Sequence, residues 1–147
     1  MYPYLIAALL LVLDQIIKTL VVRFLMPVDT MAILPGVLNF TYSENRGVAF
    51  GMLSGGRILF ILFTVAIILG ICWIVEKMKR NDLWFTVLLA VIMGGAAGNL
   101  VDRIRLGFVV DYIHFSFFPY IFNFADSCVV VGAILLGAAV VLSLIHI

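Results

Sequence analysis

The chain has 147 residues, of which 65% are hydrophobic and 12% are charged, and its formal net charge is +1. This composition excludes an ordinary soluble domain, which is about half apolar and about a quarter charged. A nearly balanced charge without a long basic block also argues against a nucleic-acid-binding protein. We therefore expect a single integral membrane domain over residues 1–147.

Four apolar segments are long enough to cross a bilayer, whose core of ~30 Å needs ~20 residues of helix. The first carries Asp14 and Lys18, and it lacks the basic start and the cleavage site of a signal peptide, so we expect it to be retained. The second and third are uncharged, and the fourth has Asp126 as its only acid. The predicted spans are residues 4–25, 58–75, 83–101 and 124–147.

The connection between the second and third spans is short and basic. It holds Lys77, Lys79 and Arg80, and tryptophans 73 and 84 flank it as interfacial aromatic residues do. The positive-inside rule places this connection in the cytoplasm. Both termini then lie in the cytoplasm as well, and the two longer connections lie outside.

The outer connections contain stretches that are typical of strands. Residues 36–42 alternate partly between apolar and polar side chains, and residues 107–115 are rich in valine and aromatic residues. We expect a small β-structure on the outer membrane surface. Glycines in the first outer connection, around Asn45, suggest a lid that excludes bulk water.

Each polar residue near the spans has a structural interpretation. Asp14 and Lys18 are four residues apart on one helix and could form an ion pair or support a site. Asn123 and Asp126 have the spacing of a helix capping box. Asp111 could be a solvated loop residue.

The end of the third span also has structural interpretations. Asp102 and Arg103 could form an interfacial charge pair, and Gly94, Gly95 and Gly98 fit close helix packing. Taken one at a time, these interpretations leave unexplained why so many polar side chains gather at one membrane boundary.

A pair of carboxyl groups offers a functional explanation for this gathering. Two carboxyl groups a few ångströms apart cannot both ionise readily, so Asp111 and Asp126 would share a proton, as the two aspartates of pepsin do. The ionised partner can take a proton from water, and the protonated partner can donate to the carbonyl oxygen under attack. Asn99 and Arg103 could donate to that oxygen. This chemistry hydrolyses peptides without a metal or a covalent intermediate.

The sequence offers fewer of the residues and motifs that other functions would need. The sequence has two histidines, no HExxH motif and no GxSxG motif, so we expect neither a zinc site nor a serine triad. A small transporter or proton-conducting membrane protein is the main alternative, and a helix-association scaffold is the third. The distance between the Asp111 and Asp126 carboxyl groups discriminates among them, since more than ~10 Å would prevent joint action through one water.

Five blocks of the sequence resemble the lipoprotein signal peptidases, the bacterial signal peptidase II family. They occur in the family's order and cover essentially the whole chain: DQIIK at 14–18, ENRGVAFG at 44–51, GGAAGNLVDR at 94–103, VVDY at 109–112 and FNFADS at 122–127. Members usually end in a polar tail, and this sequence ends in apolar residues.

The resemblance implies an aspartic endopeptidase that cleaves prolipoproteins on the N-terminal side of a diacylglyceryl-modified cysteine. It implies that Asp111 and Asp126 are the catalytic pair. The residues that it implies for substrate binding and support are Asn99, Arg103, Asn45, Asn123, Asp14 and Asp102.

The resemblance also implies a mainly α membrane fold. Four transmembrane helices would carry a small extracytoplasmic β-cradle and a short periplasmic helix in the bacterial plasma (inner) membrane, with the active site toward the extracytoplasmic side. The expected partners are diacylglyceryl-modified prolipoproteins, membrane lipids and globomycin-type inhibitors. We expect a monomer that needs no cofactor or metal and binds no nucleic acid.

Overall fold

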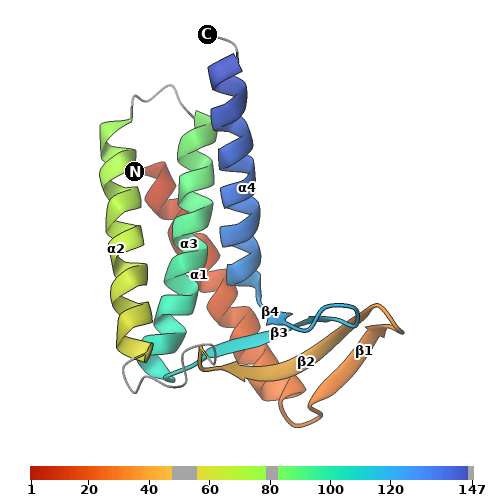
Figure 1. Ribbon diagram of the computed structural model, residues 1–147. Helices are drawn as coiled ribbons and strands as arrows, with labels where there is room; N and C mark the ends of the chain where they lie inside the picture. The colour runs from red at the N-terminus through yellow and green to blue at the C-terminus, as the bar shows by residue number, and fades with distance from the viewer. Residues whose placement is uncertain (48–55, 79–82, 146–147) are drawn as a thin grey trace.

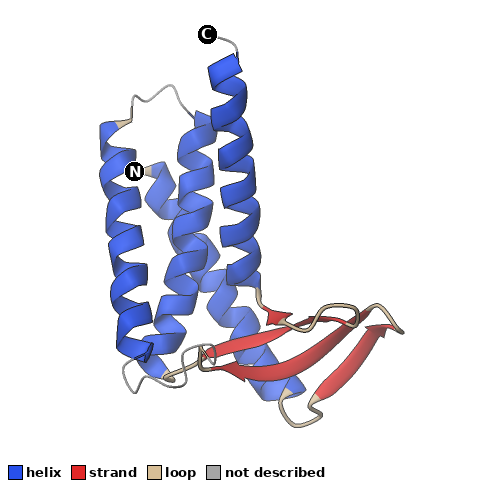
Figure 2. Ribbon diagram, viewed as in Figure 1, coloured by secondary structure: helices blue, strands red, loops and turns tan. Residues whose placement is uncertain are grey.

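In the computed structural model, long helices stand side by side and a small antiparallel sheet projects from one end of the bundle (Figures 1 and 2). The structure describes residues 1–47, 56–78 and 83–145. Its helices are α1 (Tyr2–Leu20), which continues as the π-helical turn η1 (Val21–Leu25), α2 (Gly56–Lys77), α3 (Leu83–Arg105) and α4 (Phe124–Ile145). Its strands are β1 (Thr30–Leu34), β2 (Leu38–Asn45), β3 (Val109–Phe115) and β4 (Ile121–Phe122).

The prediction of four spans is confirmed. Within the described ranges, four helices are long and apolar enough to cross a membrane. The third helix continues past its predicted end at residue 101 to Arg105, because Asp102 is buried and pairs with a lysine of α1 rather than ending the span. Both termini lie at the end of the bundle opposite the sheet (Figure 1), as an even number of spans requires.

Helix α3 is the centre of the bundle and packs against the other three helices. Small residues make this close packing possible. A Cβ atom on Gly95 would lie 2.5 Å from the carbonyl oxygen of Ala125, and one on Gly98 would lie 2.5 Å from Oδ2 of Asp14. The predicted role of these glycines in close helix packing is therefore confirmed.

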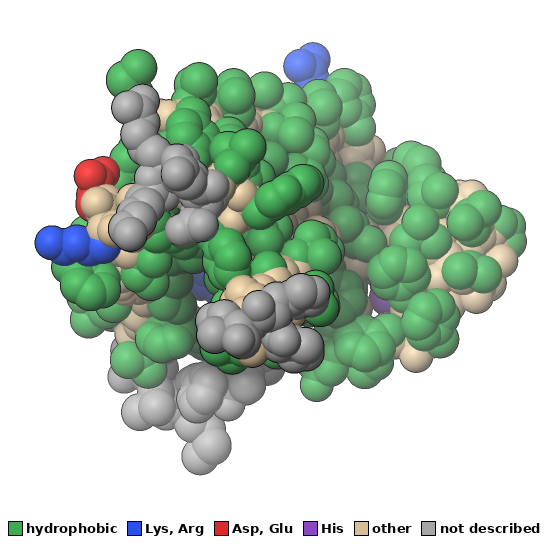
Figure 3. Space-filling model, turned by 90° about the horizontal axis from the view of Figure 1, so that it is seen from above, with side chains coloured by type: hydrophobic (Ala, Val, Ile, Leu, Met, Phe, Trp, Pro, Cys, Tyr) green, Lys and Arg blue, Asp and Glu red, His purple; other side chains and the backbone are tan. Residues whose placement is uncertain are grey.

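The outer faces of the helices are apolar. Large hydrophobic side chains of α1, α2 and α4 are exposed, among them Leu9, Phe63 and Leu144. Figure 3, which views the molecule from the end that carries the termini, shows hydrophobic side chains covering most of this face of the bundle and of the projecting sheet. The apolar sides of the helices are stable in lipid, whose acyl chains are as apolar as these side chains.

The sheet has the strand order β1-β2-β3-β4. Its two long strands confirm the β-structure predicted around residues 36–42 and 107–115, and β1 and β4 extend it. The antiparallel register pairs Ser43 of β2 with Asp111 of β3, and Asn45 with Val109. A short outer helix is not found among the described elements and stays a prediction, and the glycine-containing segment 48–55 expected in the lid lies outside the described residues.

Candidate active site

The two predicted catalytic acids lie where the sheet joins the helices. Asp111 is on β3, and Asp126 is in the first turn of α4. One residue, Asn123, binds both of them. Its side-chain Nδ2 donates to Oδ1 of Asp111 at 2.6 Å, and its backbone N–H donates to Oδ2 of Asp126 at 3.4 Å. The two carboxyl groups are thus neighbours across a single asparagine.

Local helix capping fixes the position of Asp126. Helix α4 begins at Phe124, so Asn123 is its N-cap residue. The backbone N–H of Asp126 donates to Oδ1 of Asn123 at 2.8 Å, and the return bond is the one from the Asn123 backbone. The predicted capping box is therefore confirmed, and it holds the Asp126 carboxyl group at the positive end of the helix dipole.

Asp111 is buried, with 2% of its surface exposed, so its interpretation as a solvated loop residue is wrong. Its carboxyl group also accepts a hydrogen bond from Nδ2 of Asn45 at 2.9 Å. Burial, followed by the negative charge of Asp126, raises the pKa of Asp111 to about 6. This carboxyl group can hold a proton in mildly acidic conditions, where an ordinary aspartic acid is ionised.

The side-chain amide of Asn99 is held in one orientation. Its Nδ2 donates to Oδ1 of Asp126 at 2.7 Å. Its Oδ1 accepts from Nδ2 of Asn123 at 3.1 Å and from Nζ of Lys18 at 2.9 Å. Because an ammonium group can only donate, Lys18 directs the amide oxygen toward itself and the amide NH₂ toward Asp126.

Lys18 is in turn held by two carboxylates. Its Nζ lies 3.0 Å from Oδ2 of Asp14 and 2.8 Å from Oδ2 of Asp102, and all three side chains are buried. The predicted Asp14–Lys18 ion pair is confirmed. The predicted pair between Asp102 and Arg103 is wrong, because adjacent helical residues point about 100° apart and Asp102 faces α1. Oδ1 of Asp14 is buried and has no hydrogen-bond partner within the described part of the chain.

Arg103 lies near the two acids, at the end of α3. Its guanidinium group stacks over the ring of Phe60, 5.2 Å from the ring centre, and an Nη donates to the carbonyl oxygen of Asn99 at 3.4 Å. Among the described residues it forms no ion pair with an acid. Its guanidinium group thus has no carboxylate partner within the described part of the chain.

Two adjoining cavities reach the acids from different sides. One has a volume of about 440 Å³ and is lined by Asp126, Asn99, Arg103 and apolar side chains of α2 and α4. The other has a volume of about 370 Å³ and is lined by Asp111 together with residues of β2 and α2. Three residues line both cavities: Asn45, Tyr120 and Ile121. One of the two acids thus lines each cavity, and the shared residues place the cavities next to each other.

Sequence reasoning missed the contact of Lys18 with Asn99 and the contributions of Gln15 and Tyr112. The bond from Lys18 to Asn99 and the bond from Gln15 to Asp102 connect α1 with α3, which the spacing within one helix does not reveal. The sequence analysis named Tyr112 only as a member of the block VVDY. Its hydroxyl oxygen accepts a hydrogen bond from the backbone N–H of Phe124 at 3.2 Å and so connects β3 to the start of α4.

Comparisons with known proteins agree on one family. The model of the family described as signal peptidase (SPase) II matches residues 6–142. A lipoprotein signal peptidase of Caldanaerobacter subterraneus subsp. tengcongensis is 47% identical, with 90% of each chain covered, and one of Halothermothrix orenii is 43% identical, also with 90% of each covered. A solved structure of a bacterial membrane enzyme superimposes with a TM-score of 0.86 at 33% identity, covering 95% of this chain and 92% of the other.

Proposed function

Since the chain belongs to the signal peptidase II family, we propose that Asp111 and Asp126 are the water-activating pair with which it removes signal peptides from prolipoproteins. The family assignment makes the chain a membrane peptidase. The proposal adds the aspartic mechanism and the scissile bond, on the N-terminal side of a diacylglyceryl-modified cysteine. Membership of this family also favours hydrolysis over the transporter and scaffold alternatives.

The observation that carries the proposal is the shared asparagine between the two acids. Asn123 donates to both carboxyl groups, and each carboxyl group accepts one further amide, from Asn45 or from Asn99. Both acids are thereby held on rigid elements beside adjoining cavities. Such preorganisation is what acid and base catalysis requires of its two groups.

In the proposed reaction, the pair carries one proton. Asp111, with its raised pKa, is the partner that holds it, and Asp126 is ionised beside the amide of Asn99 and the start of α4. Asp126 takes a proton from water, whose oxygen attacks the scissile carbonyl carbon. Asp111 donates its proton to the carbonyl oxygen. Collapse of the tetrahedral intermediate returns a proton to the pair and transfers one to the leaving amine.

Asn99 and Arg103 are the proposed contacts for the substrate backbone. Both line the larger cavity, and Arg103 forms no ion pair with an acid of the described segments. The remaining lining of this cavity is mostly apolar and includes Phe63, Ile67 and Val130. Acyl chains on the substrate cysteine fit such a lining, and a lipid-anchored substrate could enter from the bilayer between α2 and α4.

The remaining expectations also belong to this proposal. We propose that the sheet end faces the extracytoplasmic side of the bacterial plasma membrane, and that the enzyme acts as a monomer. Globomycin-type inhibitors would occupy the cavity proposed for the substrate.

Cleavage of a purified prolipoprotein tests the proposal. The protein is reconstituted in lipid and given the same precursor with and without the diacylglyceryl group, and the products are identified by mass spectrometry. We expect a mature chain that begins at the lipidated cysteine, produced at least ~10-fold faster from the lipidated precursor, since truncating a substrate's remote binding groups slows catalysis. Equal rates on the two precursors, or a cut at another bond, would refute the proposed specificity.

A further inference from the structure

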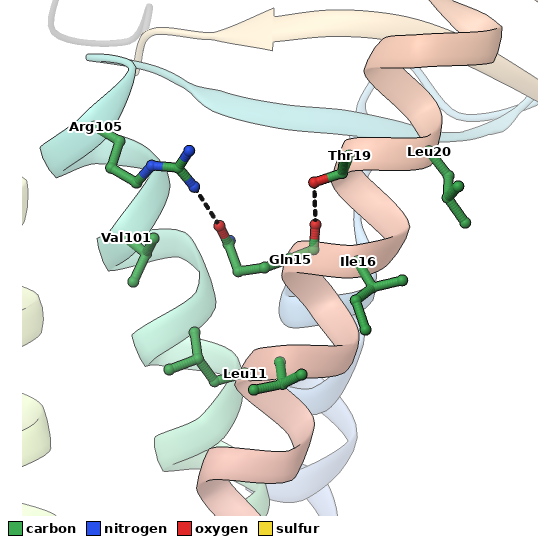
Figure 4. Close-up of a pocket in the computed structure, with 8 residues that line it drawn as sticks. Leu11, Gln15, Ile16, Thr19, Leu20, Val101 and Arg105 are labelled. Carbon is green, nitrogen blue, oxygen red and sulfur yellow. Dashed lines mark hydrogen bonds between the residues drawn. The ribbon is translucent and has the colours of Figure 1, made fainter.

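A second groove lies on the face of α3 away from the proposed active site. It runs between α1 and α3, has a volume of about 480 Å³, and is lined along most of its length by apolar side chains such as Leu11, Ile16 and Val101 (Figure 4). The active-site cavity is lined instead by Asn99 and Arg103 of α3. Residues two apart on a helix point about 200° apart, so the two hollows lie on opposite faces.

The groove becomes polar at the end nearest the sheet. There, Arg105 of α3 extends toward Gln15 of α1, and Thr19 lies one turn further along (Figure 4). An Nη of Arg105 lies 3.4 Å from Oε1 of Gln15, a long contact for a hydrogen bond. A second cavity of about 300 Å³ adjoins this end, shares Gln15, Thr19 and Arg105 with the groove, and adds Arg23.

Two arginines lie at this end, Arg23 and Arg105. Neither Arg23 nor Arg105 forms an ion pair with any acid of the described segments. Asp102 also lines the second cavity, but its carboxylate is bound by Lys18, by Gln15 and by the backbone N–H of Val110. The Arg23 guanidinium group lies 5.4 Å from the centre of the Phe24 ring, and that of Arg105 makes the long contact with Gln15. Two guanidinium groups that no described carboxylate neutralises therefore lie beside an apolar groove.

We propose that this groove binds one phospholipid with an anionic headgroup. An acyl chain would lie along Leu11, Ile16 and Val101, and the phosphate would bind Arg105 and Arg23. Because α1 and α3 span the membrane, lipid is what covers this face, and the sheet end of the helices is where headgroups lie. A guanidinium group matches a phosphate with two parallel hydrogen bonds. A headgroup with net negative charge is favoured, because in phosphatidylcholine the choline group offsets the phosphate charge.

Lipid titration of the full-length protein in neutral detergent tests the proposal. Binding of phosphatidylglycerol and of phosphatidylcholine is measured by native mass spectrometry for the parent protein and for Arg23→Gln, Arg105→Gln and Lys77→Gln. The last variant is the control, since it removes one exposed positive charge at the opposite end of the bundle. We expect phosphatidylglycerol to bind more tightly than phosphatidylcholine, and each arginine variant to bind it about fivefold more weakly, the factor typical of one interfacial basic residue.

Two further variants separate the headgroup from the acyl chain. Val101→Trp fills the groove and should weaken the binding of both lipids. Arg105→Lys keeps the charge and should retain the preference for phosphatidylglycerol, which keeps the test informative if Arg105→Gln fails to fold. None of these positions lies in the proposed active site, so loss of lipid binding with peptidase activity intact still supports the inference.

Several outcomes would overturn the proposal. Equal affinity for the two lipids would show that the site does not select an anionic headgroup. If Lys77→Gln weakened the binding of phosphatidylglycerol as much as the arginine variants do, the effect would be due to net charge and not to this site. Competition by inorganic phosphate as strong as that by phosphatidylglycerol would indicate a site for a free anion. A concentration-dependent dimer lost in Val101→Trp would assign this face to a second copy of the chain.

Discussion

Asn123 shows how one side chain can serve both the helix and the candidate site. Its Oδ1 caps α4, while its Nδ2 donates to Asp111 and to Asn99. The capping role was predictable from the spacing of Asn123 and Asp126. The bond to Asp111 was not, because it depends on the path that the chain takes through β3 and back.

The pKa of Asp111 gives a prediction at the scale of one hydrogen bond. A proton on Asp111 is proposed to be needed for catalysis, so activity should fall as the pH rises through a value near 6. Asn45 donates to this carboxyl group and favours its ionised form. Asn45→Ala should therefore raise the pKa of Asp111 and move the upper limb of the kcat/KM profile to higher pH, by about one unit for the loss of one charge-assisted bond.

Asn39→Ala is the matched control for this measurement. Asn39 is on the same strand, but its side chain donates to Ser116 rather than to an acid. Its pH profile should match that of the parent protein. The proposed role of the Asp111 proton would be contradicted if the upper limb of the kcat/KM profile did not shift in Asn45→Ala. It would also be contradicted if that limb shifted by the same amount in both variants.

Lys18 marks the limit of sequence reasoning for single residues. Its spacing from Asp14 indicated an ion pair within one helix, and the structure has that pair. The additional contacts of Lys18 with Asp102 and Asn99 depend on how closely α1 and α3 approach. The sequence indicates that glycines permit such an approach, but it does not specify which polar side chains then meet.

Among the elements, the contact between α3 and α4 controls the position of Asp126. Gly95 packs against the first turn of α4, where an added Cβ would lie 2.5 Å from the carbonyl oxygen of Ala125 and 2.9 Å from Cβ of Cys128. Gly95→Ala should push α4 away from α3 and so displace Asp126, the next residue. We expect a loss of about 1–3 kcal/mol of stability, as for other overpacked cores, together with reduced peptidase activity.

Gly70→Ala provides the comparison for this substitution. Gly70 is in α2, and a Cβ there would meet no atom within 4 Å. Alanine is the better helix former, so this variant should keep its thermal midpoint in detergent or raise it slightly. Equal midpoints for the Gly95 and Gly70 variants would show that the close contact between α3 and α4 does not limit stability.

The helices could be predicted more completely than the sheet. A run of about 20 apolar residues has few structural solutions in a bilayer, so the four spans follow from composition alone. The strand β2 was recognised only in part, and β1 was not recognised, because its exposed pattern of Thr30–Leu34 has no regular alternation of buried and exposed positions. Both strands are defined by pairing with neighbours, which a single sequence does not reveal.

At the scale of the whole molecule, the termini lie at one end and the sheet at the other (Figure 1). The proposed orientation puts the sheet outside the cytoplasm and the end of α2 inside it. In a background without Cys72 and Cys128, a cysteine at the exposed position of Val37 should react with a membrane-impermeant maleimide in intact cells. A cysteine at Lys77 should react only after permeabilisation. The opposite pattern would place the acids on the cytoplasmic side.

The architecture of the whole chain also explains why the family was recognisable from five short blocks. Four of them contribute side chains to one continuous network, from Asp14 and Lys18 through Asn99 and Asn123 to Asp111. The fifth adds Asn45 at its outer end. These segments are distant in the sequence and come into contact only in the fold, so no single block would have identified the site.

The central claim, that Asp111 and Asp126 act together on one water, is tested most directly by cleavage of the lipidated precursor with Asp111→Asn and Asp126→Asn. Each carboxyl group now accepts one hydrogen bond on each of its two oxygens, and asparagine keeps only one of these oxygens, so each variant loses one of the two bonds. Both variants should still fold, since such a loss costs about 1–3 kcal/mol. Asp29→Asn is the matched control, because Asp29 lies at an exposed turn with φ of 63°, which asparagine tolerates. We predict that each active-site variant loses ~10²-fold or more of its turnover while it still unfolds cooperatively on heating, and that Asp29→Asn keeps full activity. Full activity in either active-site variant would contradict the account.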